Sequence, residues 1–317
     1  MKLLFSADYH IKLKTKNIPE EWARNRFIQL FEKLSDLEKQ VDTHVVGGDF
    51  FDKMPTLEEL ELYYEFVSSR KCKTIIIPGN HEALKKNTTF LTYLKTITAR
   101  LSNNLVEVID DFHSFENIDV IPYNCLKQYH PADIDMHGDI LITHVRGDIP
   151  PHVKAEVDLS LFDRWKVVLA GDLHSYDNCQ RNILYPGSPL TTSFHRNMVD
   201  TGVIMLDTDT LDHRFIKLDL PQLIRKTIQA GEEMVVTPPH HTIYEVEGDM
   251  DELAGIQDHD LMDKKVVKRS TDTALILDPE MTVEQEIAEY LAFILELPQE
   301  TIDKVMSEYH DCILSGS

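Results

Sequence analysis

Short apolar runs that stop directly at a polar residue limit what this chain can fold into more than any other feature. In residues 45–52, two valines and two glycines lead into Asp49. The run predicts a buried strand, and glycine lets the backbone lie close to whatever Asp49 binds. Because ligands of open α/β sheets lie at the carboxyl ends of strands, Asp49 is expected at a functional site.

The same arrangement recurs at four other predicted strand ends. The five motifs are Asp8-x-His10, Gly48-Asp49-x-x-Asp52, Gly79-Asn80-His81-Glu82, Thr143-His144 and Gly171-Asp172-x-His174. Carboxylate, amide and imidazole groups are the donors that Mn, Fe or Zn accept. A single Asp-x-His pair is usually incidental, but five ordered strand ends of this kind predict one shared metal site.

The segments between these motifs alternate between strand and helix. Strands are predicted at residues 1–7, before Asp49 and at 73–78, and apolar residues recur at helical spacing from Pro19 to about Leu37 and again after Pro55. This β-α-β-α-β order favours parallel strands in an α/β domain. The later strands, up to residue 206, are short and joined by little helix, which indicates a second sheet stacked on the first.

The sequence pattern changes from about Asp207. Strands are predicted at 213–218, 242–246 and 274–277, and residues 264–269 form a dense basic run. That run is either a solvated strand edge or a contact for a DNA backbone. Two amphipathic helices, 282–295 and 301–314, are separated by Leu297-Pro298 and are expected to form a helical hairpin.

Charge and composition narrow the class of protein. The formal net charge of −22 argues against a free-standing nucleic-acid binder, since phosphate contacts are made by Lys and Arg. Bound divalent metals or a basic partner would remove that objection. The apolar runs are strand-sized rather than the roughly 20 residues of a membrane span, and the amino terminus lacks the shape of a signal peptide. Four scattered cysteines fit a reduced, cytoplasmic protein.

The ordered motifs resemble the calcineurin-like metallophosphoesterase superfamily, whose pattern runs D-x-H, G-D-x-x-D, G-N-H-D/E, H, G-H-x-H. Residues 48–52, and Tyr-Pro-Gly-Ser-Pro-Leu at 185–190, are similar to SbcD-type nuclease subunits, most of all to the recombination exonuclease subunits of large tailed phages. Protein phosphatases of the superfamily carry Arg-Gly after the second aspartate, where this chain has Lys53-Met54.

The resemblance implies an α/β (α+β) fold built as a four-layer αββα sandwich over residues 1–205. It further implies a smaller α/β capping domain over 206–280. The helices of 281–317 would then either dock a partner subunit or complete the core of the cap.

The resemblance also implies a role for each motif residue. One metal would be held by Asp8, His10, Asp49 and His174, and the second by Asp49, Asn80, His144 and Asp172. Asp49 would bridge the two ions, since a carboxylate has lone pairs for both. His81 would protonate or stabilise the leaving group, a task that suits an imidazole because imidazoles in general exchange protons near neutral pH.

Two acidic residues depart from the family pattern. Asp172 stands where the pattern has histidine. As a ligand it adds negative charge and favours hard ions such as Mn or Mg over Zn; the alternative is that it weakens the second site. Asp52 stands where relatives carry a second histidine, and it either orients a neighbouring side chain or acts directly.

The function implied is a two-metal DNA nuclease subunit that hydrolyses phosphodiester bonds, with Mn the expected ion and Mg a second choice. It would be a double-strand exonuclease with endonuclease activity that serves recombination, repair or replication. It would work in the cytoplasm (the host's, if a phage encodes it) as a homodimer within a heterotetramer with an SbcC-like coiled-coil ATPase.

Two alternatives stay open. The first is a general phosphodiesterase acting on nucleotides, against which the carboxyl-terminal addition and the segment Pro186–Pro189 argue. The second is a non-catalytic scaffold with the same fold. The retention of His81 and of a donor at every ligand position argues against a scaffold.

Overall fold

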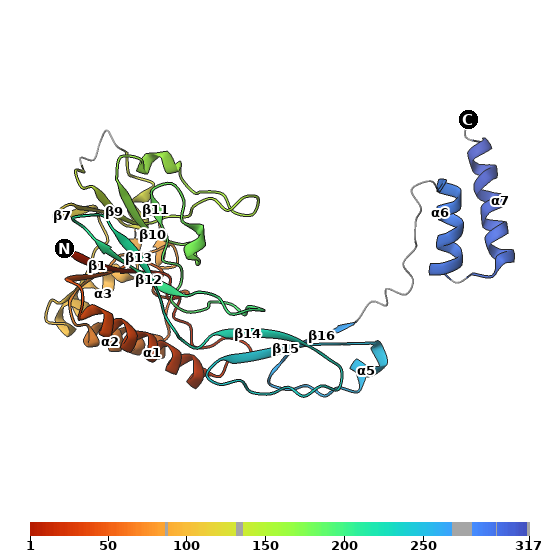
Figure 1. The fold of residues 1–317 in the computed structure, drawn as a ribbon, viewed down its shortest axis with the longest axis horizontal. Helices are drawn as coiled ribbons and strands as arrows, with labels where there is room; N and C mark the ends of the chain where they lie inside the picture. The colour runs from red at the N-terminus through yellow and green to blue at the C-terminus, as the bar shows by residue number, and fades with distance from the viewer. Residues whose placement is uncertain (86–87, 131–135, 268–280, 296, 316–317) are drawn as a thin grey trace. The chain divides into compact units, whose positions relative to one another are not determined.

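The computed structural model describes the chain except for residues 86–87, 131–135, 268–280, 296 and 316–317 (Figure 1). It forms two compact units. The first contains residues 1–228, 232–245 and 258–264, and the second contains residues 229–231, 246–257 and 265–317. The predicted strand at 274–277, and Lys268 and Arg269 of the basic run, lie outside the described residues.

The first unit contains a six-stranded sheet in the order β13-β12-β1-β2-β3-β6. Its strands are β1 (Lys2–Ser6), β2 (Thr43–Val46), β3 (Lys73–Ile76), β6 (Val106–Val108), β12 (Gly202–Asp207) and β13 (His213–Lys217). Strands β1, β2, β3 and β6 are parallel, as the β-α-β-α-β order predicts, whereas β12 and β13 run antiparallel to their neighbours. The carboxyl ends of β1, β2 and β3 therefore meet at one edge.

A five-stranded sheet has the order β11-β10-β9-β8-β7. Its strands are β7 (His113–Phe115), β8 (Ile118–Ile121), β9 (Ile140–His144), β10 (Val167–Gly171) and β11 (Ile183–Leu184). Strands β8 to β11 are parallel, and Gly171 of β10 lies opposite His144 of β9. A small hairpin, β4 (Ala83–Lys85) with β5 (Thr88–Thr89), lies apart from both sheets.

Three apolar clusters separate four layers in this unit. One packs helices α1 (Glu20–Glu38), α2 (Leu57–Ser69) and α3 (Leu91–Leu101) on the first sheet. The second lies between the sheets and joins residues such as Phe5, Val45 and Ile142. The third covers the outer face of the second sheet with α4 (Tyr123–Leu126) and a 3-10 turn, Leu159–Phe162. This layering confirms the predicted αββα sandwich, although short turns make up much of the fourth layer.

The predicted boundary after residue 205 differs from the structure, because it falls inside β12. Strand β13, which the prediction assigned to the capping domain, is the edge strand of the first sheet. The polar segment that begins at Asp207 is the turn between β12 and β13, so the change in composition there marks a turn rather than a new domain.

Past β13 the chain forms a three-stranded sheet in the order β14-β15-β16, from Leu223–Gln229, His241–Gly248 and Met262–Val267, together with helix α5 (Met250–Ala254). In the second unit, α6 (Val283–Glu289) continues as a π-helical stretch, Tyr290–Ile294, and is followed by α7 (Gln299–Ser315). The two helices lie side by side as the predicted hairpin (Figure 1). None of the helices in the described residues combines the length and the apolarity that crossing a membrane requires.

His44 of β2 is packed in the interior. Its Nδ1 lies 2.7 Å from Glu38 Oε1 and its Nε2 lies 2.8 Å from Ser6 Oγ. All three residues are at most 1% exposed, and Arg70 donates to the same Glu38 carboxylate. These hydrogen bonds tie α1 to β1 and β2, which is a structural role.

Candidate metal centre

The loops that follow five parallel strands converge at one edge of the sandwich. Backbone hydrogen bonds join the first two loops, from the Asp8 amide to the Gly48 carbonyl and from the His10 amide to the Asp49 carbonyl, both at 3.0 Å. The Asp172 amide, at the end of β10, donates to Asp8 Oδ1 at 3.0 Å. The loops of the two sheets are thus held together by backbone amides, one of which donates to the Asp8 carboxylate.

Asp49 lies at the middle of this edge. Its side chain is 2% exposed, and its Oδ2 lies 3.6 Å from His10 Nε2, 3.5 Å from His144 Nε2 and 3.9 Å from His81 Nε2. A single carboxylate oxygen therefore faces imidazoles from three other loops. That is the placement expected of a ligand shared by two ions.

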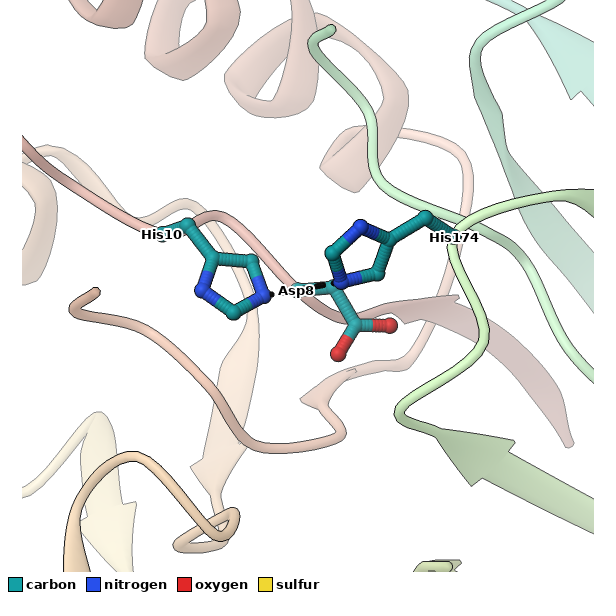
Figure 2. A group of neighbouring side chains, drawn as sticks. All are labelled: Asp8, His10 and His174. Carbon is teal, nitrogen blue, oxygen red and sulfur yellow. Dashed lines mark hydrogen bonds between the residues drawn. The ribbon is translucent and has the colours of Figure 1, made fainter. Parts of the chain in front are cut away.

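Asp8, His10 and His174 make one group of donors (Figure 2). One ligand atom of each lies within 4.8 Å of the others, and His10 Nε2 is 3.0 Å from His174 Nε2. Two neighbouring ligands at right angles on one ion, each with a bond of about 2.1 Å, lie about 3 Å apart. On its far side, His174 Nδ1 lies 3.1 Å from Thr192 Oγ1, which leaves Nε2 facing the group.

Asp49, His144 and Asn80 make the second group of donors. His144 Nδ1 donates to the Gly47 carbonyl at 2.8 Å, so Nε2 carries the lone pair that a metal would use. That nitrogen lies 2.9 Å from the Asn80 amide group and 3.9 Å from Asp172 Oδ1. The structure thus brings all seven predicted ligands to one place, with Asp172 at the margin.

Four of these residues have backbone conformations that side chains rarely adopt. The φ angles of Asp8, His10, Asp49 and Asp172 are 58°, 46°, 51° and 103°. Positive φ costs free energy for any residue with a Cβ, and such strain clusters at functional sites. The network of hydrogen bonds between the loops holds the strained residues in place.

Two glycines keep room for Asp49 and His144. Gly48 has φ of 94°, and a Cβ there would lie 2.5 Å from His144 Nδ1. A Cβ on Gly79 would overlap the Asp49 carboxylate. The glycines that flank the motifs are therefore required by close approach, as the sequence predicts for Gly48.

Crowding shifts the pKa values of these groups in opposite directions. Burial raises the pKa of Asp8 well above its usual value. Burial would also raise the pKa of Asp49, but His144, His10 and His81 together outweigh it and lower that pKa. Burial opposes a proton on His144, but the carboxylates of Asp49, Asp8 and Asp172 together outweigh it and raise the pKa of His144 to about 10. Burial lowers the pKa of His10 to about 3, which leaves a neutral imidazole with a lone pair to give.

These residues fit divalent cations. Buried carboxylates need nearby positive charge, and within the cluster a proton on His144 supplies part of it. A cation placed among the donors would supply more and would leave His144 neutral, the form that ligates metal.

Glu82 is a residue of this site whose role the sequence did not reveal. Its carboxylate accepts hydrogen bonds from the amides of Asp49 (3.0 Å), Phe51 (3.0 Å) and Gly79 (2.7 Å). It is fully buried, and burial together with the Asp49 charge raises its pKa to about 7. Glu82 thereby holds the loop that carries Asp49 against the loop that carries Asn80 and His81.

We expect Glu82→Gln to weaken Mn²⁺ binding by roughly 10–100-fold, the usual effect of losing a partner that orients ligands. The glutamine amide would face backbone N–H groups and leave one unsatisfied, so the free energy of unfolding should fall by about 1–3 kcal/mol. Calorimetric titration with Mn²⁺ and urea unfolding measure the two effects.

Glu59→Gln is the matched control, because Glu59 is a buried carboxylate that accepts from the amides of Leu13 and Thr56, neither of which is a predicted ligand. It should lose stability and keep its affinity for Mn²⁺. Wild-type affinity in Glu82→Gln would contradict the role assigned to Glu82.

Asp52 and His81 meet at the rim of the site. The Asp52 carboxylate pairs with Lys12 Nζ at 2.8 Å and lies 4.0 Å from His10 Nδ1, too far for a hydrogen bond. The Asp52 carbonyl lies 2.6 Å from His81 Nδ1, so Nδ1 carries a proton and Nε2 is the free nitrogen. Asp52 thus orients His81 through its backbone.

Two further histidines lie as follows. His195 and His174 both line a cavity of about 490 Å³. The residue after His195, Arg196, donates to Glu245 Oε2. His241 is 6% exposed and its Nε2 contacts the Asn17 carbonyl.

Comparison with known proteins decides the family. The model of the calcineurin-like phosphoesterase family matches residues 1–197, which include every predicted ligand. The chain belongs to this family. Calcineurin-like phosphoesterases hydrolyse phosphoester bonds with divalent metals, and this member is a metal-dependent phosphodiester hydrolase.

Two viral proteins are similar to this calcineurin-like phosphoesterase. The chain is 41% identical over 318 residues to the "Probable exonuclease subunit 1" of Escherichia phage T5, covering 97% of both chains. It is 25% identical to a protein of Invertebrate iridescent virus 6 named as a phosphoesterase, over 65% of this chain and 75% of that one. A solved structure of an archaeal phosphodiesterase aligns with 17% identity and a TM-score of 0.39 over 69% of this chain and 100% of that one, too low to add to the assignment.

Proposed function

We propose that this chain is the nuclease subunit of a recombination exonuclease of the kind carried by large tailed phages. The observation that carries the proposal is the extent of its similarity to the phage T5 protein. That match covers 97% of both chains and so includes the parts beyond the phosphoesterase domain. A shared catalytic domain alone would leave the substrate open, whereas a match along the whole chain favours DNA as the common substrate.

The partner follows from the same comparison. The T5 protein is named as a subunit, which supports a second chain in the assembly. We propose an SbcC-like coiled-coil ATPase as this partner, in a heterotetramer built around a homodimer of the present chain. A partner would also supply the basic surface that a chain of net charge −22 lacks. The assembly would act in the cytoplasm of the host.

The side chains divide the proposed reaction between them. Seven side chains would hold two divalent ions: Asp8, His10, Asp49, Asn80, His144, Asp172 and His174. We propose Mn²⁺ because the oxygen donors outnumber the imidazoles, which favour softer metals. Such ions, when bound, polarise the phosphate and lower the pKa of a water. His81 lies at the rim with its Nε2 free, where it can give a proton to the leaving oxygen.

One observation supports a second candidate, hydrolysis of small nucleotide esters. The cavity beside His174 measures about 490 Å³, within the roughly 300–1,000 Å³ of small-ligand sites. A small ester could therefore occupy the place that a strand end occupies in the first proposal.

Purified chain should release nucleotides from linear duplex DNA when Mn²⁺ is present and stop when a chelator is added. A small chromogenic phosphodiester is offered in parallel, with His81→Ala as the catalytic control. Cleavage of the small ester alone, even after the ATPase partner is added, would favour the second candidate. Cleavage of neither substrate, with His81→Ala equal to wild type, would overturn both.

A further inference from the structure

One arginine donates a hydrogen bond to each oxygen of the Asp172 carboxylate. Arg146 Nε lies 3.0 Å from Asp172 Oδ2, and Arg146 Nη2 lies 3.2 Å from Asp172 Oδ1. The Asp172 side chain is 6% exposed and the Arg146 side chain 45%. Two parallel hydrogen bonds from a planar guanidinium fix the plane of a carboxylate, which a lysine ammonium cannot do.

The two residues meet because of the register of neighbouring strands. His144 ends β9 and lies opposite Gly171, the last residue of β10. Arg146 follows two residues after His144, and Asp172 follows directly after Gly171. The strand that provides a metal-binding histidine therefore also provides the arginine for the ligand on the next strand.

The fork leaves Asp172 able to bind a cation. An ionised carboxylate has about four lone-pair sites, and a bidentate arginine occupies two. Oδ1, one of the two oxygens held by Arg146, lies 3.9 Å from His144 Nε2, at the margin of the donor group of the second ion. The arginine thus holds one oxygen of Asp172 on the side of His144.

Arg146 also offsets the charge that an aspartate brings. A carboxylate in place of a neutral imidazole makes the donor set one charge more negative, and the guanidinium restores it. Asp52, another carboxylate near the donors, is likewise paired with a cation, Lys12, at 2.8 Å. Arg146 therefore cancels the extra negative charge that Asp172 was expected to bring to the second metal site.

We propose that Arg146 is the positioning residue of the second metal site, which holds Asp172 in the orientation that binds the ion. The inference rests on the two-metal function proposed above. Arg146 acts through Asp172 and needs no contact with the substrate.

Arg146→Lys tests this, because it keeps the charge and removes the fork. Calorimetric titration of the full chain with Mn²⁺ should show two ions in wild type and a second ion bound roughly 10–100-fold more weakly in the variant. Its rate on a small chromogenic phosphodiester should recover at high Mn²⁺ concentration, which a general loss of structure would not allow.

The same change in an Asp172→His background separates positioning from other effects. An imidazole does not need the paired hydrogen bonds of the guanidinium. Arg146→Lys added to Asp172→His should therefore change the affinity for the second ion by less than about threefold. That result would mean that the effects of the two substitutions are coupled. Arg181→Lys is the control, because Arg181 also contacts both oxygens of an aspartate, Asp163, but through Nη2 alone and at a largely exposed position.

The outcomes distinguish the two proposals. Fewer than two ions in wild type would count against the two-metal function itself. Two ions in wild type with unchanged affinity in Arg146→Lys would overturn the positioning role alone. Tighter binding would overturn it too, since Arg146 would then compete with the ion for Asp172. Equal weakening in both backgrounds would show that Arg146 only supports the fold.

Discussion

Asp49→Asn is expected to lower the rate of phosphodiester hydrolysis by on the order of 10³-fold or more. Asp49 Oδ2 lies between 3.5 and 3.9 Å from imidazoles of three loops, and a neutral amide in its place cannot bridge two ions. Metal ions supply several kcal/mol of transition-state stabilisation, and each 1.4 kcal/mol is a factor of ten. Initial rates with Mn²⁺ and calorimetric counting of bound ions measure the loss.

Asparagine is the informative replacement at this position. Asp49 has φ of 51°, and asparagine tolerates the left-handed region better than most residues. The lowered pKa of Asp49 means that its ionised carboxylate, beside His144, stabilises the metal-free fold, so the thermal unfolding midpoint of the variant should fall modestly. Lost activity in a variant that is still folded at the assay temperature assigns the effect to the site.

The matched control for this variant is Asp36→Asn. Asp36 is 72% exposed on α1 and pairs only at the surface with Lys39. It should keep wild-type activity and both ions. Retention of more than a tenth of the activity by Asp49→Asn, with two ions still bound, would remove Asp49 from the centre of the mechanism.

The convergence of strand ends could be predicted from the sequence because it follows from local rules. A short apolar run predicts a strand, the intervening helices require parallel strands, and parallel strands end at the same edge. Asp8, Asp49 and Asn80 are therefore brought near one another by topology, whereas His144 comes from the second sheet and joins them because the two sheets stack. The αββα layering rests on the same pattern together with the resemblance to a known family.

Arg146 and Glu82 could not be assigned in this way. The partner of Arg146 depends on which residue of β10 lies opposite His144, and register between strands distant in sequence leaves no local signal. Glu82 lies within a recognised motif, but the amides that it accepts from belong to two loops, after β2 and after β3. Its role appears only when those loops are placed side by side.

The end of the first sheet was misjudged for a related reason. Strand β13 has only exposed and half-buried residues and follows a polar turn, so its pattern resembles the start of a new domain. Its assignment depends on pairing with β12, which pairs with β1 from the other end of the chain. The composition of a segment does not reveal that it joins a sheet whose other strands lie far away in the sequence.

His81→Ala is expected to lower the rate on duplex DNA by roughly 10²–10³-fold, the usual contribution of a positioned general acid. His81 Nδ1 is held by the Asp52 carbonyl at 2.6 Å, which directs Nε2 to the rim, and the side chain is 37% exposed. A proton on Nε2 can therefore reach the leaving oxygen of a bound strand. The sugar oxygen of DNA is a poor leaving group and needs that proton.

A diester with a nitrophenolate leaving group separates this role from metal binding. Nitrophenolate leaves without protonation, so His81→Ala should lose no more than about tenfold with it.

His10, Asp49 and His81 also form a group whose ligand atoms lie within 4.8 Å, so His81 could instead bind an ion. In that case His81→Ala would lose a bound Mn²⁺ and equal activity on both substrates. His213→Ala, at an exposed histidine on β13, serves as the control. Unequal losses with both ions retained would identify His81 as the general acid.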